Sequence, residues 1–113
     1  RKNLIHSHPG KLPSFKGSTT IYYSILKSKR IFCSTIILGE KIDQGNILFL
    51  KEYKFPKKIK QIDEKFDNFI RSSNMLYVIK NFHKLKIKKQ RKNNYQPYYV
   101  AHPLLRSIVF QSF

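Results

Sequence analysis

The chain has 113 residues, which is enough for one small domain with a single hydrophobic core and too few for two. Its 23 basic and 6 acidic side chains give a formal net charge of +17, and its hydrophobic fraction of 41% argues against a disordered chain. It has no long apolar run, no signal-peptide profile and a single cysteine, which excludes an internal disulfide and a cysteine zinc cluster. We therefore expect a cytoplasmic domain that binds no membrane.

The excess of basic residues has two explanations that the sequence leaves open. A charge of +17 predicts a polyanion partner, such as nucleic acid. The composition is also rich in Lys, Ile, Asn, Phe and Tyr together, which nucleotide bias in a gene produces without selection for binding.

The first stretch whose side chains could take part in catalysis or metal binding runs from His6 to Gly17. In an extended strand, His6 and His8 point to the same side, because residues two apart share a face. Pro9 and Gly10 then favour a turn, so both imidazoles lie at a strand end. By residue type, a metal site shared with Asp43 and a hydrogen-bonded hinge histidine are equal candidates. The spacing matches no established metal signature, and we expect no metal.

The elements after this stretch alternate between helix and strand. Residues 18–29 predict a short helix with an N-cap hydroxyl among residues 18–20. Residues 31–38 predict a strand buried on both faces, in which Cys33 is a buried side chain rather than a reactive thiol. Residues 46–53 predict a second strand, antiparallel to the first, with Asp43 at the tip of the connecting loop.

The C-terminal half reads as helical and basic. Apolar spacing predicts a helix over 57–70, a break at residues 72–74, and a second helical run whose core side chains are Met75, Leu76, Val78, Ile79 and Phe82. The charge run 84–92 could be an edge strand, a phosphate-facing tract or, as the favoured reading, a solvated tail. The final segment is expected to pack against the domain through Val100, Leu104, Leu105 and Ile108.

The order of these motifs resembles the formyltransferase family that uses 10-formyltetrahydrofolate, which includes glycinamide ribonucleotide, methionyl-tRNA and sugar-amine formyltransferases. Its motif reads Asn-x-His-Pro, Leu-Pro, an aromatic, a basic residue and Gly, then Asp-x-Gly and Ile-Leu. Here, the run from His8 through Leu12-Pro13 to Gly17 and the later segment 42–48 are similar to it, and the separation of His8 from Asp43 fits.

The resemblance implies an α/β fold and only part of a domain. We expect the C-terminal part of a Rossmann-like formyltransferase domain, with central strands, flanking helices and the N-terminal half absent. Residues 1–113 would form this single partial domain. Within it, residues 1–56 would be the motif-bearing core, and residues 57–113 a helical and basic closing segment.

The resemblance also implies roles for single residues. His8 would stabilise the oxyanion or protonate the departing folate nitrogen, and Asp43 would keep His8 protonated and help to take a proton from the amine. His6 stands where the family has Asn and could donate one hydrogen bond as a neutral imidazole. The donor-facing loop comprises Glu40, Lys41, Ile42 and Asp43. The wall between donor and amine comprises Pro9, Gly10, Lys11 and Gly17.

The function implied is formyl transfer from 10-formyltetrahydrofolate to a primary amine. A sugar amine of a nucleotide sugar is the favoured acceptor, because the chain shows no added domain for tRNA. Two alternatives stay open: a basic nucleic-acid-binding module that uses the charge run and the nearby tyrosines Tyr95, Tyr98 and Tyr99, and a non-catalytic remnant of the same fold.

Overall fold

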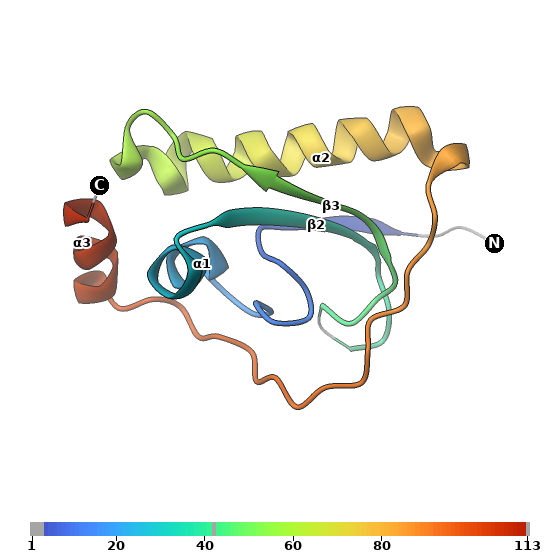
Figure 1. The fold of residues 1–113 in the computed structure, drawn as a ribbon, viewed down its shortest axis with the longest axis horizontal. Coiled ribbons are helices and arrows are strands. Elements are labelled where there is room, and N and C mark those ends of the chain that lie inside the picture. The colour runs from blue at the N-terminus through green and yellow to red at the C-terminus, as the bar shows by residue number, and fades with distance from the viewer. Residues whose placement is uncertain (1–3, 42, 113) are drawn as a thin grey trace.

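The fold is a small antiparallel sheet with helices on both sides, seen in a computed structural model that describes residues 4–41 and 43–112. Strands β1 (Ile5–His8), β2 (Ile31–Ile37) and β3 (Ile47–Tyr53) lie in the order β1-β2-β3. Helix α2 (Asp67–Asn81) crosses one face, and helix α1 (Thr20–Ser28) lies on the other side (Figure 1). An α/β fold with central strands and flanking helices is thus confirmed. The described strands pair antiparallel throughout, so the Rossmann-like part of the expectation stays a prediction.

The central strand β2 is buried along almost its whole length. Its residues 31–36 are buried, as the sequence predicted, because α2 packs on one face and α1 on the other. Cys33 is fully buried, and this burial raises the pKa of its thiol to about 12. The thiol is therefore protonated at neutral pH and unreactive, which confirms its expected structural role.

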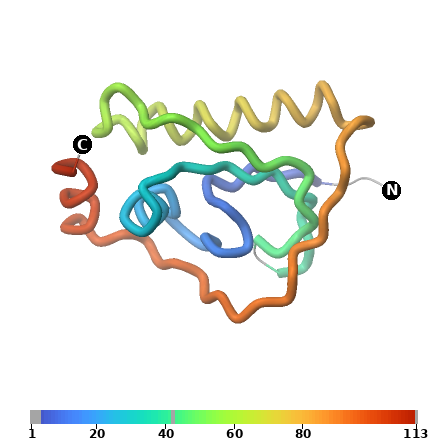
Figure 2. The backbone as a smooth tube through the Cα atoms, in the orientation of Figure 1, coloured from blue at the N-terminus to red at the C-terminus, as the bar shows by residue number. Residues whose placement is uncertain are grey.

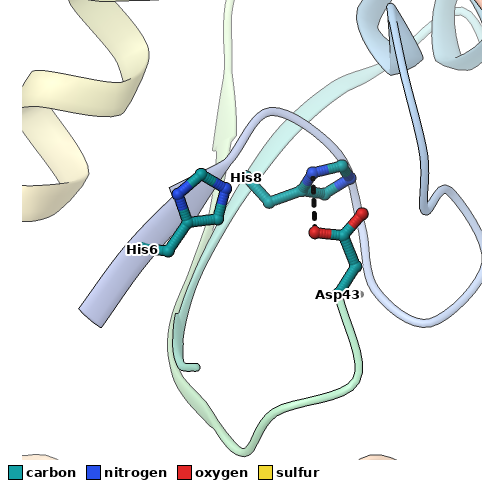
Figure 3. A group of neighbouring side chains, drawn as sticks. All are labelled: His6, His8 and Asp43. Carbon is teal, nitrogen blue, oxygen red and sulfur yellow. Dashed lines mark ion pairs between the residues drawn. The ribbon is translucent and has the colours of Figure 1, made fainter. Parts of the chain in front are cut away.

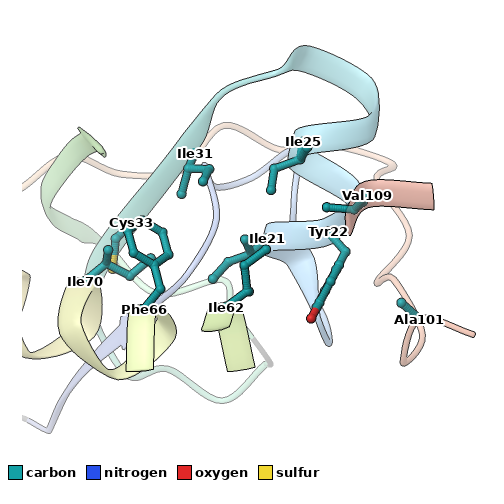
Figure 4. Close-up of a cluster of buried hydrophobic side chains, with 10 residues drawn as sticks. All are labelled: Ile21, Tyr22, Ile25, Ile31, Cys33, Ile62, Phe66, Ile70, Ala101 and Val109. Carbon is teal, nitrogen blue, oxygen red and sulfur yellow. The ribbon is translucent and has the colours of Figure 1, made fainter. Parts of the chain in front are cut away.

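The hydrophobic core joins β2, α1, the start of α2 and the C-terminal helix α3 (Pro103–Gln111), as Figure 4 shows. Its buried members are Ile21, Tyr22, Ile25, Ile31, Cys33, Ile62, Phe66, Ile70, Ala101 and Val109. The C-terminal segment does pack onto the domain, but through Ala101 and Val109. Of the four side chains expected there, only Leu105 contacts the core, whereas Val100, Leu104 and Ile108 are exposed.

Helix α2 is longer than the sequence predicted. A short 3-10 turn (Ile59–Gln61) and a π-turn (Ile62–Phe66) lead into it, and it continues without a break to Asn81. The predicted break at residues 72–74 is wrong because the side chain of Asn74 points into the fold. Its Nδ2 donates to the Cys33 carbonyl oxygen at 2.9 Å, and its Oδ1 accepts from the Tyr53 hydroxyl at 2.5 Å. The amide therefore does not compete for the helix backbone.

Only one stripe of α2 faces the sheet. Ile70, Asn74 and Val78, spaced by four residues, are the buried positions of this helix. Of the predicted core residues in this part of the helix, only Val78 is buried. Leu76, Ile79 and Phe82 are exposed, and Met75 is half-buried. The apolar periodicity predicts a wide core face, whereas the sheet covers only the narrow stripe of Ile70, Asn74 and Val78.

Helix α1 confirms its predicted position but not its predicted cap. Thr19 occupies the N-cap position in a left-handed conformation, with φ of 49°, and its side chain makes no capping hydrogen bond. Its hydroxyl instead donates to the Ser18 carbonyl oxygen and accepts the Ala101 N–H. The hydroxyl thus ties the start of α1 to the C-terminal segment.

We call residues 85–102 the strap, because this extended segment runs along the side of the sheet opposite α2 (Figures 1 and 2). Its backbone is anchored at two points. Lys88 exchanges backbone hydrogen bonds with Ile47 at 2.7 and 2.9 Å, and Tyr98 bonds the backbones of Lys16 and Ser18 at 2.8 and 2.9 Å. A solvated tail was therefore the wrong reading, although the basic side chains of the strap are exposed. In the part of the chain that the structure describes, no helix has the length and apolarity of a membrane span.

Candidate active site

The structure brings together the histidine and the aspartate that the motifs singled out. His8 is the last residue of β1, and Asp43 lies in the loop between β2 and β3. His8 Nδ1 lies 3.5 Å from Asp43 Oδ1, with the two side chains only 4% and 8% exposed (Figure 3). His6 lies beside them, and one ligand atom of each of the three residues lies within 4.8 Å of the others. This geometry could also hold a metal ion.

Strand β2 positions His8 through its hydroxyl side chains. Ser7 and Thr35 share a buried hydrogen bond of 2.7 Å between neighbouring strands. The Ser34 hydroxyl donates to the Gly10 carbonyl oxygen at 2.6 Å and accepts the Leu12 N–H at 3.2 Å, so it fixes the turn after His8. Polar groups on a buried strand are therefore satisfied by the loop that carries the imidazole.

The turn after His8 requires glycine at position 10. A Cβ atom on Gly10 would lie 2.7 Å from the Phe15 carbonyl oxygen and 3.0 Å from His8 Nε2. Any larger residue would push against the ring or against the backbone that holds it. Pro9 and Gly10 are both buried, so here they shape the support of His8, and their predicted part in an acceptor wall stays a prediction.

The hydrogen bonds of His8 assign its tautomer. Nε2 lies 2.6 Å from the Phe15 carbonyl oxygen, which can only accept, so Nε2 carries the proton. The nearby Thr20 hydroxyl already donates to the Pro9 carbonyl oxygen at 2.6 Å. Burial lowers the pKa of His8, and the Asp43 carboxylate opposes this shift without outweighing it. A neutral ring with its proton on Nε2 presents the Nδ1 lone pair to Asp43, and a protonated ring presents an N–H to it. The protonated His8 that the resemblance implies stays a prediction.

Asp43 is held from two directions. Its backbone is left-handed, with φ of 56°, and its Oδ2 accepts the Gly17 N–H at 2.9 Å. The Gln90 side chain of the strap donates to the Asp43 carbonyl oxygen at 2.8 Å and to the Gly45 carbonyl oxygen at 2.7 Å. Gly17 itself has a φ of 107°, and a Cβ there would collide with the Tyr98 backbone. A glycine at this position therefore lets the strap approach the site closely.

The other predicted site residues are spread around this centre. Glu40 and Lys41 are exposed in the loop before Asp43, and Ile42 lies outside the described residues. Lys11 is exposed at the rim of a cavity of about 780 Å³ under the strap. The sequence analysis missed the contributions of Phe15, Thr20 and Gln90. Phe15 acts through its carbonyl oxygen on His8, and Thr20 through its hydroxyl on the Pro9 carbonyl oxygen, and neither contact follows from a local sequence pattern. Gln90 is an uncharged residue within the basic run, and this interruption is the one signal that could have singled it out.

Comparison with known proteins gives structural matches only. No protein-family model and no curated protein matches the chain. A sugar N-formyltransferase from a Shewanella species has 19% identity and a TM-score of 0.64, over 96% of this chain and 50% of that one. Methionyl-tRNA formyltransferase from Clostridium thermocellum has 20% identity and a TM-score of 0.64, over 90% and 44%.

A third match carries ligands. The formyltransferase PseJ from Anoxybacillus kamchatkensis, in complex with UDP-4,6-dideoxy-4-formamido-L-AltNAc and tetrahydrofolate, has 21% identity and a TM-score of 0.61, over 84% of this chain and 51% of that one. The chain thus spans about half of each of these three structures, and at such identities the likeness is one of fold. The chain therefore has the fold of about half of a formyltransferase, of the kind seen in sugar N-formyltransferases and methionyl-tRNA formyltransferase.

Proposed function

We propose that the chain belongs to an enzyme that transfers a formyl group from 10-formyltetrahydrofolate to a primary amine, with His8 and Asp43 as its catalytic pair. The observation that carries the proposal is the buried contact of 3.5 Å between His8 Nδ1 and Asp43 Oδ1. Two residues far apart in sequence are held there by backbone groups of Phe15 and Gly17. A buried pair of titratable groups supported in this way is typical of acid–base sites.

The geometry suits the proton transfers of this reaction. Attack of an amine on a formamide-like carbon develops negative charge on oxygen and needs a proton moved from the amine to the leaving nitrogen. Asp43 Oδ1 and the lone pair of His8 Nδ1 are neighbouring proton acceptors, so a proton taken from the amine can be held between them and delivered to the leaving nitrogen. His6, beside His8, would donate a hydrogen bond to the developing oxyanion.

The loop before Asp43 supports the proposed donor, and the similar folds support the proposed acceptor. Glu40 and Lys41 are exposed next to Asp43, so their side chains are accessible to a folate donor. For the acceptor, we propose the amine of a nucleotide-linked sugar. Sugar N-formyltransferases recur among the similar folds, and the formyltransferase PseJ was solved with a formamido sugar nucleotide and tetrahydrofolate. We keep the cytoplasm as the proposed compartment of this reaction.

The test measures amine-dependent loss of the formyl group from 10-formyltetrahydrofolate, in the chain and in any longer protein that contains it. Asp43→Asn and His8→Asn are expected to lower the rate by about 100- to 10,000-fold, the range of general acid–base catalysis. His83→Asn, at an exposed histidine after α2, is the matched control and leaves the rate unchanged. An undiminished rate in folded Asp43→Asn would refute the role of the carboxylate.

One observation keeps the nucleic-acid-binding alternative in view. The cationic side chains of the charge run are all exposed, and no acidic residue follows Asp67 in the sequence. If this surface binds nucleic acid, affinity for single-stranded RNA falls steeply as salt rises. Tyr98, however, stacks on Tyr23 with ring centroids 4.3 Å apart, so it is already engaged within the fold. Absence of salt-sensitive RNA binding would remove this alternative.

A further inference from the structure

Lys16 is a buried cation without an anionic partner among the described residues. Lys16 is only 4% exposed, and no carboxylate among the described residues forms an ion pair with it. Its Nζ donates to the Asn93 Oδ1 at 3.4 Å, a long bond to a neutral acceptor. Burying an ammonium group is costly unless it is paired, so the position calls for an anion.

The surroundings of Lys16 are suited to receiving that anion. Lys16 lines a cavity of about 500 Å³ between the loop before Asp43 and the strap. Lys41, Gln44, Asn93 and Asn94 contribute to the same walls, and the exposed carboxylate of Glu40 lies at them too. A neighbouring cavity of about 520 Å³ shares four of these residues and adds Arg91 and Lys92. Ammonium, guanidinium and amide groups are the donors that bind phosphate and carboxylate oxygens.

Lys16 lies in the chain between the two residues whose backbones hold the candidate catalytic pair. The residue before it, Phe15, holds His8 Nε2 with its carbonyl oxygen, and the residue after it, Gly17, donates its N–H to Asp43. The backbone on either side of Lys16 is therefore fixed relative to His8 and Asp43. The strap closes the other side, since Tyr98 bonds the Lys16 carbonyl oxygen.

We propose that this cavity binds an anionic group of a reactant, a phosphate or a carboxylate, with Lys16 as the central cation. The inference deepens the proposed function and rests on it for the position of the reaction. Its chemistry fits two sources: the diphosphate of a nucleotide-linked amine and the glutamate carboxylates of a folate donor. The anion would pair with Lys16 and link the loop before Asp43 to the strap.

The test is thermal unfolding of the chain with added inorganic pyrophosphate or γ-linked triglutamate, at ionic strength matched with chloride. A ligand that binds only the folded chain raises the melting temperature in a saturable way. We expect such a rise for wild type and for Lys54→Met, a control that removes one exposed cation from a loop away from the cavity. A rise with pyrophosphate assigns the phosphate source, and a rise with triglutamate assigns the folate source.

Lys16→Met is expected to weaken the binding of the effective probe by about 10- to 100-fold, the loss of one charge-assisted hydrogen bond. Without an anion this variant melts no lower than wild type, because it removes an unpaired buried charge. Lys16→Arg retains part of the binding. The inference is overturned if wild type shows no saturable rise with either probe, or if Lys16→Met shows the wild-type rise.

The result is independent of formyl transfer. Saturable anion binding through Lys16 in a chain whose formyl transfer is unaffected by Asp43→Asn would refute the proposed catalytic role and support the anion site. If Asp43→Asn loses formyl transfer but no anion raises the melting temperature, the catalytic role is supported and the anion site is refuted. If Lys16→Met fails to fold, Lys16→Arg decides instead, because an affinity equal to that of the wild type in this folded variant would count against Lys16 as the central cation.

Discussion

Asn74→Ala is expected to lower the free energy of unfolding by about 2 to 3 kcal/mol. The Asn74 amide lies fully buried and holds α2 against β2 and β3 through the Cys33 carbonyl oxygen and the Tyr53 hydroxyl. A buried group left without its partner costs about 1 to 3 kcal/mol. The Cys33 carbonyl oxygen bears this cost, whereas half-buried Tyr53 can turn partly toward water. The better helix propensity of alanine offsets at most about 0.7 kcal/mol.

Urea unfolding followed by circular dichroism measures this loss. The matched control is Asn81→Ala on the same helix, where the amide donates to the exposed Tyr77 carbonyl oxygen and its loss costs within about 0.5 kcal/mol. A double-mutant cycle with Tyr53→Phe is expected to give a coupling energy of about 1 kcal/mol. A loss for Asn74→Ala of less than about 1 kcal/mol, or one equal to that of Asn81→Ala, would refute the claim that this amide holds α2 against β2 and β3.

Two further predictions concern His8. Gly10→Ala is expected to destabilise the chain by about 1 to 3 kcal/mol in urea, because its Cβ would lie 2.7 Å from the Phe15 carbonyl oxygen; a wild-type unfolding midpoint would contradict this. Burial lowers the pKa of His8 below its ordinary 6.5, so the unfolded chain binds the proton first. The stability from the neutral ring is therefore present above pH 6.5 and is lost as pH falls below it, and a His8 NMR titration at or above 6.5 would disprove this.

Local sequence patterns correctly predicted the elements that pack against segments close to them in the sequence. The β-branched run of residues 31–36 and the loop to β3 were identified correctly because a buried strand and its hairpin partner are encoded within a few residues of each other. The resemblance to the formyltransferase family implied that His8 and Asp43 act together, whereas the residue types alone left a metal site and a hinge histidine as equal candidates. The separation of 3.5 Å between the two side chains could be read only from the structure. The tautomer of His8 is set by the backbone carbonyl oxygen of Phe15, and the position of a backbone atom cannot be predicted from residue types.

Periodicity was misleading where a distant partner decides the outcome. Asn74 looked like a helix breaker because the sequence does not reveal that Cys33 and Tyr53 satisfy its amide. Ile79 and Val78 look equally apolar, yet one is 62% exposed and the other fully buried. An apolar pattern shows that a helix has a face, but the shape of the sheet decides which residues that face includes.

The strap, which contains part of the basic sequence, contacts the residues of the candidate site. A solvated tail would leave the Asp43 carboxylate with its contacts to His8 and the Gly17 N–H, whereas the structure adds Gln90, which donates to the carbonyl oxygens of Asp43 and Gly45. The same segment presents Asn93 to the buried ammonium of Lys16. Five of the 23 basic residues of the chain thus belong to a segment that also positions the carboxylate. Because opening the strap would remove both contacts at once, the candidate catalytic pair and the proposed anion site depend on one structural element.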